Sequence, residues 1–493
     1  MSSGGAPRTL RTAGDLGPAL IREVAAGRGL RLAPGLVQAV DRRCRQARAV
    51  LRDGRPVYGV NTGMGALAGV RLTARQQREH QRNLLLARAV GGPPWLAEAE
   101  VRALFAVRLR TFLSGDAGVS AGLCRRLADV LDAGLVPAVP RTGVGSAGEI
   151  VPLAHAFGPL CGIGRVLGPG GGASPAGAAL RSHGLAEYAL GPREGHALLA
   201  GVPGATALAV LRLADASALA ARMEAAAALS IVAASASRDP YREECGRGDR
   251  LLGQVLGRLR LIIGEAAGPV ALQAPVSFRV AGPVFAQVLR AAGDLAGAVS
   301  RALSGVTDSP AFLGGAFVGT AGFHGLGLAA GCDQLTTALA HAAEVSAARV
   351  HRLLDTRVTG LPPQLAGTPG PETGLVTVHK RAAGEVHALR RLTLPSTVGL
   401  IETSGGQEDV QSFGWEAAES LRRALHHVRA VTSCELLTGY RALALSGRPV
   451  PPRCAAVLDA VAAVVGPIDG DRPFGEDIER LSAADLGGLT AAR

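Results

Sequence analysis

The residues that could carry acid/base chemistry in this sequence lie beside glycine-rich segments. Tyr58 opens one such segment, and Asn61 follows three residues later. A phenol removes a proton only when nearby positive groups or a helix N-terminus stabilise its phenolate form. On type and position alone, Tyr58 also fits a buried core residue, and Asn61 also fits a turn-stabilising side chain.

The sequence gives less support for metal or thiol chemistry. His155 and His324 have no carboxylate or second ligand at a spacing typical of metal sites, so no metal is expected. The seven cysteines are scattered, odd in number and without a C-x-x-C pair, and no signal peptide precedes them. This pattern predicts a reducing, cytoplasmic location.

The composition predicts helices as the elements that position these residues. Hydrophobic residues make up 48% of the 493 residues and aromatic residues only 3%, so Ala, Leu and Val must build the core. Long Ala/Leu segments from about residue 195 onward fit a helical bundle, and strand signals are few. The most apolar stretch, residues 204–237, contains Arg212, Asp215, Arg222 and Glu224, which indicates a buried helix or helix pair and no membrane span. We expect two domains, residues 1–195 and 196–493.

The net charge of +12 comes almost entirely from arginine, since Lys380 is the only lysine. Coding bias explains this, because Arg, Ala, Gly and Pro are enriched together. No basic run is interleaved with aromatic residues that could stack on bases. We therefore expect no nucleic-acid partner.

Several segments resemble the histidine/phenylalanine ammonia-lyase family, in order and nearly in spacing, over about residues 57–445. Tyr58–Gly65 reads YGVNTGMG, similar to Y-G-[VI]-N-T-G-[FM]-G, and Gly145–His155 reads GSAGEIVPLAH, similar to G-A-S-G-D-L-A-P-L-A-H. The other segments are Gln81–Leu84, Arg193–Leu199, Gln273–Val280, Phe323–Gly325 and Gln407–Asp409. The resemblance implies a mainly α fold, a long-helix bundle of the ammonia-lyase (fumarase/aspartase-like) type. It also implies a homotetramer whose pockets are lined by loops from three subunits.

The resemblance bears on the cofactor. In the family, an Ala-Ser-Gly tripeptide cyclises and dehydrates to a methylidene-imidazolone (MIO), which makes the substrate amine a leaving group. Here the aligned triplet is Ser146-Ala147-Gly148, and Ala147 has no hydroxyl to lose. We therefore expect no cofactor. The alternative is a shifted triplet, Gly145-Ser146-Ala147, in which an alanine replaces the glycine that gives the family its backbone freedom.

The resemblance also implies roles for single residues. Tyr58 matches the catalytic base, and Glu408 matches a carboxylate that assists amine handling. Arg279 matches the ligand of the substrate carboxylate, for which a planar two-pronged donor is well suited. An ion pair is the alternative for both Arg279 and Glu408. Asn61 would help to orient the same carboxylate, and Phe323 would wall the pocket or pack in the core.

Other positions depart from the family. Arg88 takes the place of a histidine that selects the substrate side chain, where it could bind an anionic group or form a salt bridge to a neighbouring subunit. Polar groups near the electrophile are replaced by Ala200, Pro203 and Val276.

Four functions follow as hypotheses. The first is an enzyme without MIO that uses Tyr58 and Arg279 for elimination, addition, isomerisation or cyclisation on an amino-acid-like or other carboxylate substrate, as in a tailoring step of secondary metabolism. The second is an MIO-dependent ammonia-lyase or aminomutase that uses Ser146. The third is a non-catalytic tetrameric binding protein, and the fourth, nucleic-acid binding, rests on charge alone.

Overall fold

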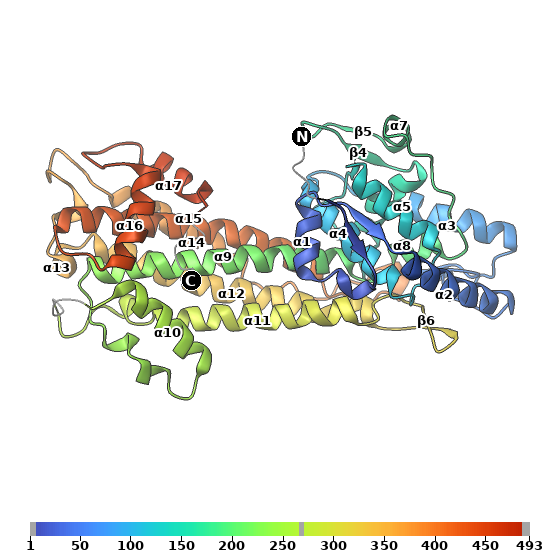
Figure 1. Ribbon diagram of the computed structural model, residues 1–493, viewed down its shortest axis with the longest axis horizontal. Helices are drawn as coiled ribbons and strands as arrows, with labels where there is room; N and C mark the ends of the chain where they lie inside the picture. The colour runs from blue at the N-terminus through green and yellow to red at the C-terminus, as the bar shows by residue number, and fades with distance from the viewer. Residues whose placement is uncertain (1–5, 266–270, 486–493) are drawn as a thin grey trace. The chain divides into compact units, whose positions relative to one another are not determined.

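The computed structural model describes residues 6–265 and 271–485 (Figure 1). The chain is mainly helical, as the composition predicted. It divides into two compact units, each assembled from three separate stretches of sequence. Unit 1 comprises residues 1–212, 295–332 and 395–419, and unit 2 comprises residues 213–294, 333–394 and 420–493. The two domains expected from the sequence, residues 1–195 and 196–493, stay a prediction.

Unit 1 contains the short helices and the strands. Helix α4 is buried on almost every side, including its charged residues Glu100, Arg102 and Arg108. Ser120 caps α5 by accepting a hydrogen bond from the Leu123 amide. The helices are α1 (Pro18–Ala25), α2 (Pro34–Arg52), α3 (Ala74–Arg88), α4 (Glu98–Leu113), α5 (Ala121–Asp132), α6 (Ile150–Phe157), α7 (Ala176–Ser182) and α8 (Glu194–Leu199).

The strands of unit 1 are only two or three residues long. The pair β1 (Arg8–Leu10) and β2 (Leu30–Leu32) is parallel, with Arg8 opposite Leu30. Strands β3 (Val136–Pro137), β4 (Arg165–Leu167) and β5 (Ala173–Pro175) form an antiparallel sheet in that order. Strands β6 (Ala311–Leu313) and β7 (Ala316–Val318) form a hairpin turned by two glycines at positive φ.

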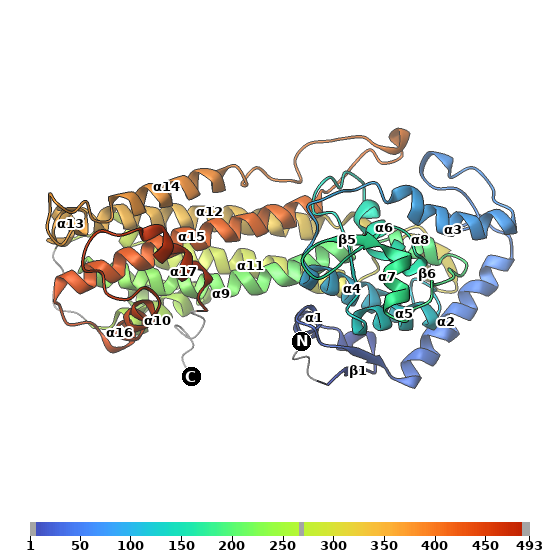
Figure 2. The same ribbon diagram turned by 90° about the horizontal axis from the view of Figure 1, so that it is seen from above.

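Unit 2 is built on parts of four long helices that run side by side in both views (Figures 1 and 2). Three of them, α9, α12 and α15, begin in unit 1, and α11 ends there. Their bounds are α9 (Pro203–Ala233), α11 (Ala281–Ser304), α12 (Leu326–Leu353) and α15 (Gly414–Ser446). The shorter helices are α10 (Arg250–Ile263), α13 (Thr356–Thr359), α14 (Val376–Arg390), α16 (Pro452–Val465) and α17 (Phe474–Ala483).

The apolar stretch predicted to be a buried helix is α9. In the described part of the chain, residues 194–233 alone are long and apolar enough to cross a membrane, but 78% of the most apolar window is buried inside the protein. Burial of this kind is typical of a core helix.

Candidate active site

The loop that follows α2 presents Tyr58 to a cavity. The Tyr58 side chain is 38% exposed, and its hydroxyl accepts a hydrogen bond from the Gly65 amide at 2.8 Å. The ring meets the imidazole of His196 edge to face, with 6.1 Å between centroids. Gly59 has φ +67°, and a Cβ there would collide with His196, so this position requires glycine. The glycine-rich loop therefore fixes both the position and the tilt of the phenol.

Asn61 stabilises this loop from within. Its Oδ1 accepts from the Val57 amide and its Nδ2 donates to the Arg55 carbonyl, both at 2.7 Å. Thr62 Oγ1 accepts from the Gly59 amide at 3.3 Å. Both polar ends of Asn61 are thus used by the turn that carries Tyr58, and Asn61 is buried beside the cavity without lining it.

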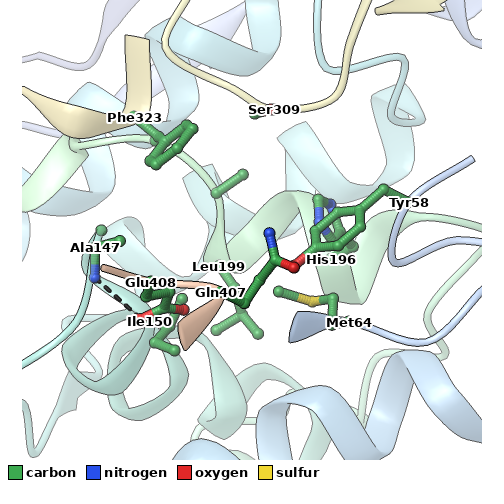
Figure 3. A pocket seen from close by; sticks show the side chains of 13 residues that line it. Tyr58, Met64, Ala147, Ile150, His196, Leu199, Ser309, Phe323, Gln407 and Glu408 are labelled. Atoms are coloured by element: carbon green, nitrogen blue, oxygen red, sulfur yellow. Dashed lines mark hydrogen bonds between the residues drawn. The ribbon is translucent and has the colours of Figure 1, made fainter. Parts of the chain in front are cut away.

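The loop that matches the tripeptide of the family forms another wall. The Ala147 amide donates to Glu408 Oε2 at 3.2 Å, drawn as a dashed line in Figure 3. Thr403 Oγ1 donates to the same carboxylate oxygen at 2.9 Å. The Ser146 hydroxyl points back into the loop and donates to the Gly148 carbonyl at 2.6 Å. Glu408 therefore ties this loop to the segment that precedes α15.

Two buried carboxyl groups lie behind this loop. Glu149 accepts from the Gly204 and Ala205 amides at the start of α9, at 2.7 and 2.6 Å. Glu416 Oε1 accepts from the Val144 amide at 3.4 Å, whereas its Oε2 has no partner among the described residues. Burial raises the pKa of each carboxyl to about 7. The loop thus rests on groups that carry a proton at mildly acidic pH.

These walls enclose a cavity of about 260 Å³ in unit 1. Tyr58, Met64 and His196 lie on one side of it, and Ala147, Ile150 and Glu408 lie across from them, with Phe323 beyond (Figure 3). The full lining is Tyr58, Met64, Ala147, Gly148, Ile150, His196, Leu199, Ala200, Gly201, Ser309, Phe323, Gln407 and Glu408.

The structure brings most of the candidate residues to this cavity. Tyr58, Glu408, Phe323, Ala147 and Gly148 line it. Ser146 lies directly behind the lining, 7% exposed.

Besides Asn61 and Ser146, two further candidate residues do not line the cavity. Arg88, at the end of α3, contacts Met64 of the lining through a long Nη2···Sδ interaction of 3.9 Å. Arg279 belongs to unit 2, where it follows a turn that includes Val276 and Phe278.

His196 and Ser309 line the pocket and were missed by the sequence reasoning. His196 is the titratable one of the two. It lies on the short apolar helix α8, where the family motif has a leucine. Burial lowers its pKa to about 3, assisted by the charges of Arg193 and Arg88, so the imidazole is neutral near pH 7. Its position as a polar residue on an otherwise apolar helix could have indicated a role in the pocket, but the same pattern is typical of a histidine buried in a core.

Known proteins resemble the chain over nearly its whole length. Histidine ammonia-lyase of Streptomyces coelicolor is 35% identical over 456 residues, which cover 87% of this chain and 86% of the relative. The crystal structure of tyrosine aminomutase from Streptomyces globisporus has a TM-score of 0.91 at 26% identity and covers 98% of each chain. The ergothioneine-degrading enzyme ergothionase from Treponema denticola has a TM-score of 0.92 at 23% identity, covering 98% of this chain and all of that one, which shows a shared fold.

The family relationship corrects the expectation about the cofactor. A model of the family "Aromatic amino acid lyase" matches residues 16–465. Members of this family, including the histidine ammonia-lyases among the relatives, use the MIO group. The expectation of no cofactor was therefore wrong, because it rested on one alignment register centred on Ala147. With a match over most of the sequence and relatives above 30% identity, this chain belongs to the aromatic amino acid lyase family.

Proposed function

We propose that this chain is an ammonia-lyase or aminomutase-type enzyme that acts on an amino-acid-like carboxylate substrate, with Tyr58 as the base. The observation that carries the proposal is that one cavity holds the Tyr58 hydroxyl on one side and the Ala147–Glu408 contact on the other. A substrate between them would present one carbon to the phenol and its amino group to the carboxylate.

The base needs to be held where it can take a proton. The Gly65 amide donates to the Tyr58 oxygen, which stabilises a negative charge on that oxygen and aims the ring. The guanidinium of Arg88 lies close enough to Tyr58 to interact with its charge. A stabilised phenolate can remove the β-proton of the substrate, which is general base catalysis.

Glu408 is suited to handle the departing amine. One of its oxygens already accepts from the Ala147 amide and from the Thr403 hydroxyl, which fixes the carboxylate in the pocket wall. A fixed carboxylate can accept a hydrogen bond from an ammonium group and can receive a proton from it.

The residues that would hold the electrophile of the family are Gly145, Ser146 and Ala147. Ser146 carries the one hydroxyl between Gly143 and Glu149, so only a triplet centred on it can lose water from a side chain. Ala147 is not among the residues with positive φ in the described chain, so its backbone conformation needs no glycine here. When formed, the group supplies an electrophile that turns the substrate amine into a leaving group.

Arg279 would bind the substrate carboxylate from a neighbouring subunit. In this protomer it belongs to unit 2 and is absent from the cavity lining, and its Nε has no partner among the described residues. A homotetramer with shared pockets, as the family implies, would bring it to the site of another copy. The cytoplasmic location stays a prediction as well.

The proposal is tested with three named compounds: histidine, tyrosine and ergothioneine, the last because of the fold neighbour that degrades it. Formation of an α,β-unsaturated acid, followed by absorbance and mass spectrometry, is expected for at least one. Tyr58→Phe is expected to slow it by roughly 10²-fold or more, whereas Tyr440→Phe in unit 2 is a matched control that leaves it unchanged.

The electrophile is tested separately by the mass of the peptide that contains residues 143–149. Loss of two waters in the wild type, and no loss in Ser146→Ala, is expected. An unmodified wild-type peptide would remove Ser146 from the proposal and leave the proton transfer by Tyr58 to be tested by turnover.

A further inference from the structure

A group of basic side chains beside Tyr58 forms no ion pair with the residues that the structure describes. His80 and Arg88 lie two turns apart on α3, and His196 lies on α8. Each has a buried side-chain nitrogen without a hydrogen-bond partner among the described residues: His80 Nε2, Arg88 Nε and His196 Nδ1. We call these three residues the basic cluster.

Arg88 is the charged member of the basic cluster, and its bonds are weak. Its Nη1 reaches the Leu84 carbonyl at 3.4 Å, and its Nη2 reaches Met64 Sδ at 3.9 Å. The described residues offer it no carboxylate within ion-pair distance. A half-buried guanidinium loses hydration without regaining strong bonds, which is costly unless an anion completes the site.

The basic cluster adjoins the cavity. His196 and Met64 are part of its lining, and Figure 3 shows both next to Tyr58. The members of the cluster interact electrostatically. Burial lowers the pKa values of His80 and His196, and the charge of Arg88 lowers them further. Glu408 on the cavity wall acts on the charge of Arg88 without forming an ion pair with it, and its Oε2 accepts from Ala147 and Thr403. Side-chain nitrogens without a hydrogen-bond partner among the described residues therefore collect at the Tyr58 end of the pocket.

We infer that the basic cluster binds an oxyanion on the side chain of the substrate, so that this enzyme prefers amino-acid-like acids with a second acidic group to matched acids without one. The planar guanidinium of Arg88 provides paired N–H donors of the geometry that a carboxylate matches. His196 provides a neutral ring nitrogen beside it. This inference rests on the proposed function, because it assigns the side chain of the same substrate.

The experiment measures the binding of two matched probes, cinnamate and 4-carboxycinnamate, by isothermal titration calorimetry on the full chain. The probes share a propenoate and a ring, and only the second has an acid at the far end. We expect the wild type to bind 4-carboxycinnamate about tenfold more tightly, the effect of one charge-assisted hydrogen bond or a pair of them. Arg88→Gln is expected to remove the difference and leave the affinity for cinnamate unchanged.

Two variants serve as references. Arg78→Gln removes the same charge from an exposed position of α3 and is expected to keep the tenfold preference. Arg88→Lys keeps the charge but loses the planar donor, and is expected to keep a smaller preference of about threefold. Because lysine preserves charge and much of the volume, it tests the inference even where Arg88→Gln folds poorly.

Three results would overturn the inference. One is equal affinity of the wild type for the two probes. Another is a tenfold preference that survives in Arg88→Gln. If light scattering also shows that this variant loses its oligomeric state, Arg88 would be assigned to a contact between subunits. A third is loss of cinnamate binding itself in Arg88→Gln, which would make Arg88 the ligand of the main carboxylate. Failure of both probes to bind the wild type would instead count against the proposed function, which requires a carboxylate site.

Discussion

The core around Glu435 in unit 2 and the surroundings of the cavity in unit 1 satisfy their buried charged side chains differently. In unit 2, Glu435 accepts at Oε1 from Ser230 and Arg349 and at Oε2 from Ser346 and Arg349, at 2.5 to 3.0 Å. In unit 1, Arg88, His196 and Glu416 each keep a buried polar atom without a partner. A buried charge with every bond made stabilises a packed core, whereas unused bonding capacity beside a cavity indicates a site for a ligand.

The largest effect that this comparison predicts is on turnover. Tyr58→Phe removes the oxygen that receives the proton and is expected to lower kcat roughly 10²- to 10⁴-fold with little change in folding. The measurement is the rate of unsaturated-acid formation with whichever named compound is turned over. This substitution at the cavity would then affect chemistry more than stability.

The complementary experiment is made in unit 2. Glu435→Gln leaves the fully buried Arg349 without a charged partner, so the free energy of unfolding should fall by about 3–5 kcal/mol. Urea denaturation followed by circular dichroism measures this. Glu385→Gln, in a less buried ion pair with Arg381, is the control. An equal loss of unfolding free energy there would show that the Glu435 network stabilises the protein no more than a less buried ion pair does.

Glu416→Gln is expected to stabilise the protein, with a dependence on pH. Burial raises the pKa of Glu416 from 4.5 to about 7 in the folded state, so the folded state binds the proton more tightly than the unfolded chain. The contribution of this tighter proton binding to the free energy of unfolding is complete below about pH 4.5 and is lost as the pH rises through about 7. The variant, neutral throughout, should therefore match the wild type at low pH and exceed it by up to about 3 kcal/mol above pH 7.

Scanning calorimetry at pH 4.5 and pH 8 checks this difference. The exposed Glu402→Gln is the control and should show no gap at either pH. A gap for Glu416→Gln that is the same at both values would contradict the assignment of this carboxyl as a buried, protonated group.

The smallest expected effect is that of Arg88→Gln on stability. Since Arg88 makes only weak contacts within the protomer, its loss should change the free energy of unfolding by less than about 1 kcal/mol. The same denaturation measurement detects it. A loss as large as that of Glu435→Gln would mean that Arg88 has a structural partner after all.

The sequence predicted the framework well because the framework repeats a simple pattern. The apolar stretch predicted as a buried helix is α9, and the Ala/Leu segments form the long helices. The strands β1 to β7 escaped notice because two or three residues are too few to show an alternating pattern. Helices and short strands therefore differ in predictability through length alone.

The site was only partly accessible from sequence. Tyr58, Glu408 and Phe323 were found through motifs, and the structure places them around one cavity. His196 was missed because a lone histidine on an apolar helix looks like a core residue. Arg88 makes only weak contacts because of how distant segments are arranged in space, and no local sequence pattern predicts that arrangement.

The most direct test of the account is the turnover of histidine, tyrosine and ergothioneine by the wild type and by Tyr58→Phe, measured side by side. The account predicts an unsaturated acid from at least one compound with the wild type and almost none with the variant. Turnover that survives in Tyr58→Phe, or no product from any of the three with the wild type, would contradict it.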